Sequence, residues 1–319
     1  MKVTVFGGTG FVGQYLIDAL VDAGMHPTLL VRPGSSSRVN RPDDCDTVEG
    51  DVDDGEAIAE AIRGADAVIY NIGILREFQR LGITFEALQE RAPIRVIDAA
   101  QALGVPRCLL MSANGVDAAS TAYQRTKLAA ERHLQRSGLE WTIFRPSVIF
   151  GDPRGRMEFA SQLNSEIIDS PMPAPLFFPG LNPSAAGRFK LSPVHVRDVA
   201  DAFIQALLQP STVGQTLHLG GPDDLSWRQI LTLIAKATGR QKLMLPVPAL
   251  GVSTAASLFD RWERFPITRD QLRMLLQGNC CSSADLAGLG IQATPFDADS
   301  LRYLSASSPE ASSSRQDAV

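Results

Sequence analysis

A tyrosine and a lysine four residues apart, Tyr123 and Lys127, are the side chains in this sequence best suited to proton chemistry. On a helix, residues at this spacing lie on one face, about one turn apart. An ammonium beside a phenol favours the phenolate, so we expect the tyrosine pKa to fall from about 10 toward neutral pH. Tyr123 would then exchange a proton with a carbonyl or an alcohol, and Ser112, at the end of a predicted strand, could hydrogen-bond the same oxygen. The alternative is a packing role for Tyr123 and ribose binding by Lys127, without turnover.

Three glycines near the start of the chain, Gly7, Gly10 and Gly13, predict a site for the phosphates of a dinucleotide. They follow a β-branched and aromatic run at residues 3–6 and precede a segment with helical apolar spacing at 14–23. The first glycine permits the sharp turn, the second lets a pyrophosphate approach the backbone, and the third lets the helix pack closely on the strand. The helix N-terminus then offers N–H groups and a favourable dipole to an anion. The alternative is a structural turn without a ligand.

The residue after the second predicted strand, at 27–31, indicates which dinucleotide fits. An acidic residue at this place binds the ribose 2′-hydroxyl of NAD, whereas a basic residue accommodates the 2′-phosphate of NADP. Arg32 occupies the place, and residues 35–38 are three serines and an arginine, with no acid nearby. The sequence therefore favours NADP(H) over NAD(H). The alternative is that Arg32 is a solvated loop charge.

Strands and helices alternate along most of the chain, which predicts an α/β fold with a doubly wound parallel sheet, the Rossmann arrangement. Its ligand is expected beyond the carboxyl ends of the strands, between the first and the fourth. Proline and glycine interrupt the alternation at 152–193. We therefore assign 1–151 plus 194–221 to an NAD(P)-binding Rossmann domain and 152–193 plus 222–303 to a small, mainly helical substrate-side lobe. Residues 304–319, which are polar and serine-rich, are expected to form a disordered tail.

Composition narrows the class of protein. The net charge of −5 and the lack of a basic run argue against nucleic acid as a partner. The four cysteines have neither metal-site nor disulfide-framework spacing, so we expect no metal and a reducing, cytoplasmic location. Met1 leads directly into a predicted strand, which argues against a signal peptide. No apolar run reaches the roughly 18–20 residues that span a bilayer. The apolar stretch 246–258 leaves open a peripheral membrane contact, a lipophilic-substrate face or burial in the small lobe.

Further motifs stand at predicted strand ends: Asn71-Ile72-Gly73, Arg145-Pro146-Ser147, and the run 193–200 with His195 and Asp198. Together with the glycine turn, Ser112 and the Tyr123/Lys127 pair, they resemble the extended and atypical short-chain dehydrogenases/reductases. Their spacing is most similar to the branch around the nucleotide-binding accessory subunit of respiratory complex I and its bacterial relatives. The resemblance runs from residue 2 to about 303.

This resemblance implies an NAD(P)H-binding oxidoreductase that transfers hydride to or from a carbonyl or alcohol of a small-molecule substrate, which includes lipophilic or quinone-like ones. It implies that Tyr123 is the acid/base and that Lys127 and Ser112 assist it. The implied cofactor residues are Gly7, Thr9, Gly10, Phe11, Val12 and Gly13 at the pyrophosphate, Arg32 at the adenosine ribose, Asp51 and Val52 at adenine, Asn71, Ile72, Gly73 and Lys127 at the nicotinamide ribose, and Pro146, Ser147 and Val148 over the nicotinamide.

Three further residues are weaker candidates for contact with the substrate: Phe177 and Phe178 in the predicted small lobe, and His195 at the start of the second Rossmann segment. His195 precedes a predicted helix at the strand-end face, where a lone histidine can equally be structural. Phe177 and Phe178 would wall an apolar pocket or fill the core of the lobe.

The resemblance also bears on the reaction. No acidic residue follows Ser112 immediately, whereas the sugar dehydratases of the group that this chain resembles carry one at that place. This difference disfavours a sugar-nucleotide dehydratase or epimerase. In the complex I branch, the bound cofactor is structural. The alternative function is therefore a non-catalytic NADP(H)-binding accessory, assembly or redox-sensing protein, linked to respiratory complex I or another membrane complex and peripheral to the inner membrane. The oligomeric state stays open.

Overall fold

The computed structural model describes residues 1–180, 182–249 and 269–306, which divide into two compact units. Unit 1 comprises Met1–Ser147, Val196–Gly220 and Cys281–Ala293. Unit 2 is built from the described parts of Val148–His195, Gly221–Cys280 and Thr294–Val319. Each unit is therefore assembled from segments that are far apart in the sequence.

Unit 1 contains a seven-stranded parallel sheet in the order β11-β6-β5-β4-β1-β2-β3. The strands are β1 (Lys2–Phe6), β2 (His26–Val31), β3 (Asp46–Glu49), β4 (Ala67–Tyr70), β5 (Arg107–Met111), β6 (Glu140–Pro146) and β11 (Gln215–Leu219). The chain runs outward from β1 to β3 on one side and from β4 to β11 on the other, so β1 and β4 flank the switch point. This arrangement confirms the predicted doubly wound fold.

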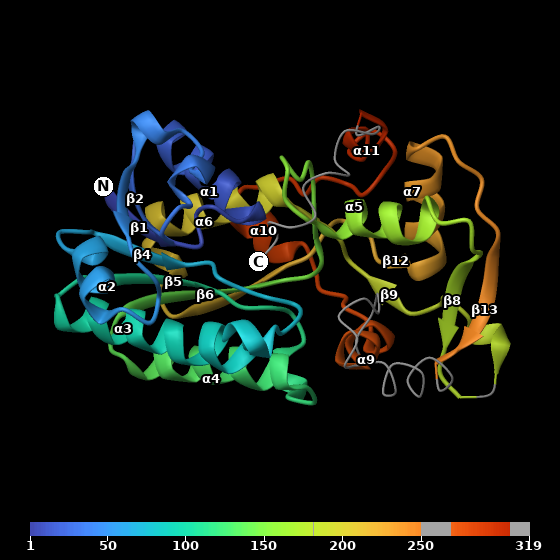
Figure 1. Cartoon of the computed structure of the whole chain (residues 1–319), viewed down its shortest axis with the longest axis horizontal. Helices are drawn as coiled ribbons and strands as arrows, with labels where there is room; N and C mark the ends of the chain where they lie inside the picture. The colour runs from blue at the N-terminus through green and yellow to red at the C-terminus, as the bar shows by residue number, and fades with distance from the viewer. Residues whose placement is uncertain (181, 250–268, 307–319) are drawn as a thin grey trace. The chain divides into compact units, whose positions relative to one another are not determined.

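Helices cover both faces of this sheet (Figure 1). On one face α1 (Phe11–Asp22) packs with α6 (Val196–Leu208), and on the other lie α2 (Gly55–Ile62), α3 (Ala92–Ala102) and α4 (Ala122–Arg136). Because both faces are covered, the central strands are apolar almost throughout: Val5, Ile69 and Leu109 are completely buried. None of the helices in the described part of the chain has both the length and the apolar character needed to cross a membrane.

The helical segment between β4 and β5 has two parts. A π-helical turn, Glu86–Arg91, precedes α3. Pro93 explains the break, because it has no N–H to donate to the carbonyl of Gln89, four residues earlier. Such turns displace side chains from the regular helical positions and occur often at functional sites.

Unit 2 combines helices with three two-stranded ribbons. The ribbons are β7 (Ile149–Phe150) with β10 (Val194–His195), β8 (Ala174–Phe178) with β13 (Met244–Pro248), and β9 (Lys190–Leu191) with β12 (Leu225–Ser226). The helices are α5 (Phe159–Leu163), followed by a π turn at Asn164–Ile168, then α7 (Trp227–Ala237), α9 (Arg269–Gln277) and α11 (Tyr303–Ala306). The core of the unit includes Phe150, Trp227 and Ile230.

The strand β13 was not anticipated from the sequence, because it carries two prolines, Pro246 and Pro248. β13 pairs with β8 alone, and a strand with one free edge tolerates residues that lack an N–H. The apolar stretch 246–258 therefore begins in a strand, and its residues 250–258 lie outside the described part of the chain.

The unit boundaries at 147, 196 and 220 lie within four residues of the sequence-based assignment, and two segments differ from it more. Residues 281–293, assigned to the small lobe, belong to unit 1, where the carboxylate of Asp285 in α10 (Ala284–Gly288) accepts a 2.7 Å bond from the backbone N–H of His218 in β11. The predicted disordered tail starts in a helix instead, because α11 extends to Ala306 and Leu304 is buried. Residues 307–319 lie outside the described part of the chain.

Arg107 in β5 joins early and late segments of unit 1. Its guanidinium is buried and donates to the backbone carbonyls of Glu140 and Ala206 and to the hydroxyls of Thr142 and Thr212, at 2.7–3.0 Å. These neutral acceptors satisfy the cation where water cannot reach it. The charge thereby ties β5 and β6 to the end of α6.

Candidate cofactor and active site

The glycine turn after β1 has the geometry that a dinucleotide site requires. Gly7 has a positive φ of 92°, which favours glycine. A Cβ atom at Gly13 would lie 2.1 Å from the Gly7 carbonyl oxygen and 2.7 Å from the backbone of Gly8. The first turn of α1 therefore packs directly on the turn, and Gly10 donates its N–H to the Gly7 carbonyl at 3.2 Å.

The N-terminus of α1 is suited to a phosphate. The residue at its N-cap, Gly10, has no side chain to cap the helix, and the first turn contains no acidic residue. Backbone N–H groups in the first turn of a helix have no partner within the helix, so they can bind an anion. The residues present thus fit a dinucleotide pyrophosphate at Thr9 to Gly13.

The segment after β4 meets this turn at the switch point of the sheet. A Cβ atom at Gly7 would lie 3.0 Å from the carbonyl carbon of Asn71 and 3.1 Å from the backbone nitrogen of Ile72. Asn71 also donates its N–H to the Phe6 carbonyl at 2.9 Å. Two segments predicted to hold the cofactor are therefore adjacent.

Lys127 connects α4 to the end of β5. Its buried ammonium donates to the Met111 carbonyl at 2.8 Å, and Met111 directly precedes Ser112. A Cβ atom at Gly73 would lie 3.4 Å from the same nitrogen. Burial lowers the pKa of Lys127 to about 8, against the opposing effect of the Glu131 carboxylate. Lys127 on α4 therefore lies close to Gly73, after β4, and to the end of β5, which Ser112 follows.

Two buried polar atoms in this region have no hydrogen-bond partner among the described residues: the Ser112 hydroxyl and Oε1 of Gln89. Both residues are at least 97% buried. The Gln89 amide nitrogen donates to the Ile74 carbonyl at 2.6 Å and would lie 4.0 Å from a Cβ atom at Gly73. Buried polar groups are normally satisfied, so these atoms fit the polar groups of a nicotinamide riboside or a substrate oxygen. Sequence reasoning missed Gln89, although Pro93 could have indicated the displaced turn that carries it.

Tyr123 differs from expectation in its pKa. Burial raises the pKa of the phenol to about 12, and the ring packs edge-on against Phe85, with centroids 5.7 Å apart. The predicted lowering was wrong for this structure, because desolvation of the phenol by burial dominates. Tyr123 is therefore a neutral phenol at neutral pH.

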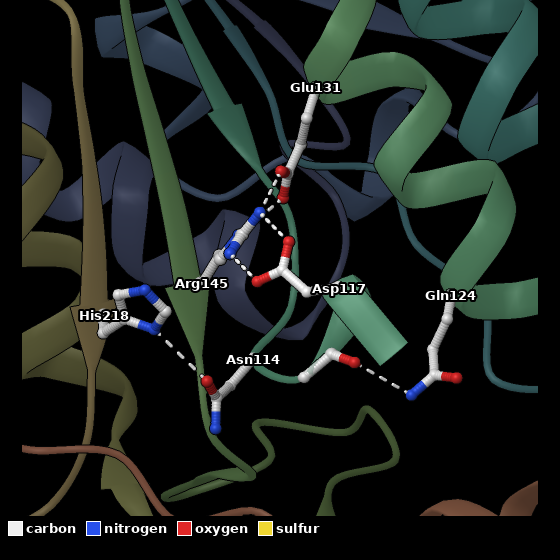
Figure 2. A network of polar contacts seen from close by, with 7 residues as sticks. Asn114, Asp117, Gln124, Glu131, Arg145 and His218 are labelled. Carbon is white, nitrogen blue, oxygen red and sulfur yellow. Dashed lines mark hydrogen bonds and ion pairs between the residues drawn. The ribbon is translucent and has the colours of Figure 1, made fainter. Parts of the chain in front are cut away.

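An ionic network lies beside these residues (Figure 2). The guanidinium of Arg145, at the end of β6, forms a two-pronged contact with the buried carboxylate of Glu131 on α4, at 3.0 and 2.6 Å. It forms a second such contact with Asp117, at 2.5 and 3.0 Å. Burial acts to lower the pKa of Arg145, but the two carboxylates raise it overall. Arg145 thus joins α4 to the segment between Ser112 and Tyr123.

Two further contacts hold that segment (Figure 2). The amide oxygen of Asn114 lies 3.2 Å from Nδ1 of His218 in β11, and Gln124 donates to the Gly115 carbonyl at 3.0 Å. Gln124 also belongs to the capping box of α4, together with Thr121. The short connection between Ser112 and Tyr123 is therefore held by β6, β11 and α4.

The other predicted residues of unit 1 lie at strand ends. Arg32 is exposed directly after β2, and Asp51 accepts from the backbone N–H of Val52 at 2.6 Å after β3. Pro146 ends β6 and accepts from the Asn114 N–H at 2.9 Å, and the N–H of Ser147 donates to the Leu219 carbonyl at 2.9 Å.

Four predicted residues belong to unit 2. Phe177 and Phe178 are buried in β8 and form part of the core, which favours their core-filling interpretation. His195 is half-buried, with its ring 5.1 Å from that of Phe150. Val148 accepts from the backbone N–H of Val194 at 2.9 Å, where β7 and β10 pair.

Comparison with known proteins agrees with this geometry. A protein family described as NAD(P)H-binding matches residues 7–169, which is just over half of the chain. UDP-glucose 4-epimerase from Thermus thermophilus, solved in complex with NAD, superposes with a TM-score of 0.72 at 18% identity, covering 96% of this chain and 98% of that one. The likeness to the epimerase shows the shared fold.

Two relatives with different roles are similar over most of the chain. The mitochondrial NADH dehydrogenase [ubiquinone] 1 alpha subcomplex subunit 9 of Mus musculus is 27% identical over 94% of this chain and 79% of its own length. The ceramide reductase of Caulobacter vibrioides is 24% identical over 82% of this chain and 78% of its own length. With a Rossmann sheet, a glycine turn of the required geometry and a family match over just more than half of its length, this chain belongs to the NAD(P)H-binding family.

Proposed function

We propose that this protein is an NADP(H)-dependent reductase or dehydrogenase of small molecules, a lipophilic or quinone-like substrate included. The observation that carries the proposal is the 2.8 Å contact between the Lys127 ammonium and the Met111 carbonyl. This contact joins α4, which carries Tyr123 and Lys127, to the end of β5, which Ser112 follows. When bound, a nicotinamide supplies or accepts hydride at a carbonyl or alcohol carbon.

The state of Tyr123 favours the direction of reduction. With a pKa raised to about 12, its phenol carries a proton at neutral pH and can donate it to the oxygen of a carbonyl that is being reduced. The Ser112 hydroxyl, which has no partner in the described structure, would hold the same oxygen. Lys127 and Gly73 would hold the ribose next to the nicotinamide.

The direct test is titration of the purified protein with NADPH and NADH, followed by a screen of carbonyl and quinone acceptors for oxidation of the bound cofactor. Oxidation that depends on one class of acceptor supports a reductase. Binding of either cofactor without oxidation by any acceptor would contradict catalysis.

Replacement of Arg32 by Ala is expected to weaken NADPH binding by about 10- to 100-fold and to leave NADH binding unchanged. A charged hydrogen bond to the 2′-phosphate contributes roughly 1.5–3 kcal/mol, and NADH has no such phosphate. Fluorescence titration with NADPH and with NADH measures the ratio of the two dissociation constants in the variant and in the wild type. Arg63→Ala removes an exposed positive charge at the end of α2 and is the control. Equal weakening of both cofactors would contradict the preference for NADP(H).

A second function is favoured by the relative from the mouse, a subunit of NADH dehydrogenase that is similar over 94% of this chain. In this proposal the chain binds NADP(H) as an accessory, assembly or redox-sensing protein, at the cytoplasmic side of the inner membrane. Affinity purification from detergent-solubilised membranes tests it. Co-purification of a respiratory complex would support it, and recovery of the chain alone, with turnover, would contradict it.

A further inference from the structure

We propose that Glu131 is a positioning residue that, held in place by Arg145, keeps Lys127 a cation at the cofactor site. The inference rests on the proposed function, because it concerns the same lysine. It adds a residue that neither the glycine turn nor the Tyr123/Lys127 motif contains.

The geometry places Glu131 in a fixed position. It follows Lys127 by four residues on α4, so the two side chains lie on one face of the helix. The Glu131 side chain is only 1% exposed, and Arg145 binds both of its carboxylate oxygens. A two-pronged contact of this kind fixes the orientation of the carboxylate.

Among the residues that the structure describes, Glu131 supplies the negative charge that acts on Lys127. On α4, Tyr123, a neutral phenol, and Glu131 stand four residues before and four residues after Lys127, on the same face of the helix. β5 contributes the Met111 carbonyl, the segment after β4 contributes Gly73, and the π turn contributes the neutral amide of Gln89. Burial alone drives Lys127 toward the neutral amine, and the Glu131 carboxylate opposes this.

Arg145 holds the Glu131 carboxylate in place through its two hydrogen bonds. Its guanidinium also binds Asp117, whose side chain is 69% exposed. With Lys127, the network contains two cations and two carboxylates, so no buried charge lacks an opposite charge nearby. Asp117 would also leave Arg145 paired if Glu131 lost its charge.

The experiment measures NADPH affinity by fluorescence between pH 6 and 9 for the wild type, Glu131→Gln, Lys127→Met and Asp98→Asn. Asp98→Asn is the matched control, because it removes a carboxylate that contacts His133 on the outer part of the same helix. The double variant Arg145→Met/Glu131→Met, which replaces the buried ion pair by apolar groups, is the second test if Glu131→Gln does not fold.

Lys127 is charged below its pKa, so wild-type affinity should fall as the pH rises through about 8. In Glu131→Gln this midpoint should move down by roughly one pH unit, which weakens binding about threefold at pH 7.5 and restores it at pH 6. Lys127→Met should lack the step, and Asp98→Asn should match the wild type.

Two results would overturn the inference: an unchanged midpoint in Glu131→Gln, or equal weakening at every pH, which a purely structural role would produce. Binding is measured without turnover, so a shifted midpoint with no acceptor activity would support Glu131 while contradicting the reductase. Failure of the wild type to bind NADPH at any pH would overturn both.

Discussion

Replacing Tyr123 by Phe is expected to lower turnover by about 10²- to 10⁴-fold, with NADPH affinity within a factor of about two of the wild type. The substitution removes the phenol that would donate the proton to the substrate oxygen, and it leaves the contact between the Lys127 ammonium and the Met111 carbonyl in place. The phenylalanine ring keeps the edge-on packing on Phe85. Single-turnover oxidation of bound NADPH by an acceptor measures the effect.

Two variants make this result specific. Ser112→Ala should lower turnover less than Tyr123→Phe, because it removes a hydrogen bond to the oxygen and leaves the proton donor in place. Phe85→Leu changes the packing around Tyr123 and keeps the phenol, so it separates packing from proton transfer. Turnover by Tyr123→Phe at the wild-type rate would refute the assigned role of this residue.

Substitution of Gly13 by Ala is expected to abolish detectable NADPH binding and to lower the melting temperature by roughly 5 °C or more. The added Cβ atom would lie 2.1 Å from the Gly7 carbonyl oxygen and 2.7 Å from backbone atoms of Gly8. Backbone atoms cannot move aside as a flexible side chain can, so α1 would have to shift away from the turn. Thermal unfolding and cofactor titration measure the two effects.

Two other glycines provide controls for this prediction. A Cβ atom at Gly10 would lie 3.4 Å from the Gly7 carbonyl oxygen, which is an ordinary contact, so the Gly10→Ala variant should fold normally. It should nevertheless bind NADPH more weakly, because the added methyl group would stand where the pyrophosphate approaches the backbone. A Cβ atom at Gly55, at the start of α2, would meet nothing within 4 Å, so Gly55→Ala should change neither property. Normal NADPH binding by Gly13→Ala would show that the turn does not hold the cofactor.

The fold of unit 1 could be predicted because its signals are local. Buried apolar strands ending in glycine or polar residues, each followed by an amphipathic helix, identify a parallel sheet without knowledge of distant contacts. The fold of unit 2 could be predicted less completely from the sequence. Its strand β13 carries Pro246 and Pro248, and proline normally argues against a strand. Only the pairing of β13 with β8, which local sequence does not show, makes it one.

The sequence singles out candidates for the site by local signals. Spacing along one helix points to Tyr123 and Lys127, and chain position points to Arg32; the roles of all three stay predictions. Spacing could not predict that burial would raise the Tyr123 pKa, since desolvation depends on residues such as Phe85 that lie distant in sequence. The Arg145–Glu131 contact was also missed, although a glutamate four residues after Lys127 and an arginine before Pro146 both stood in the sequence.

The discontinuous build of unit 1 has a consequence for the order in which the protein can form during synthesis. β6 ends at Pro146, but its neighbour β11 begins only at Gln215, and α6 lies just before it. A nascent chain that has reached Ser147 exposes β6 as a bare sheet edge, and Arg107 lacks the acceptors Ala206 and Thr212. At translation rates of roughly 5–20 residues per second, that incomplete sheet persists for several seconds. Unit 1, which contains β1, is therefore complete only when most of the chain has emerged from the ribosome.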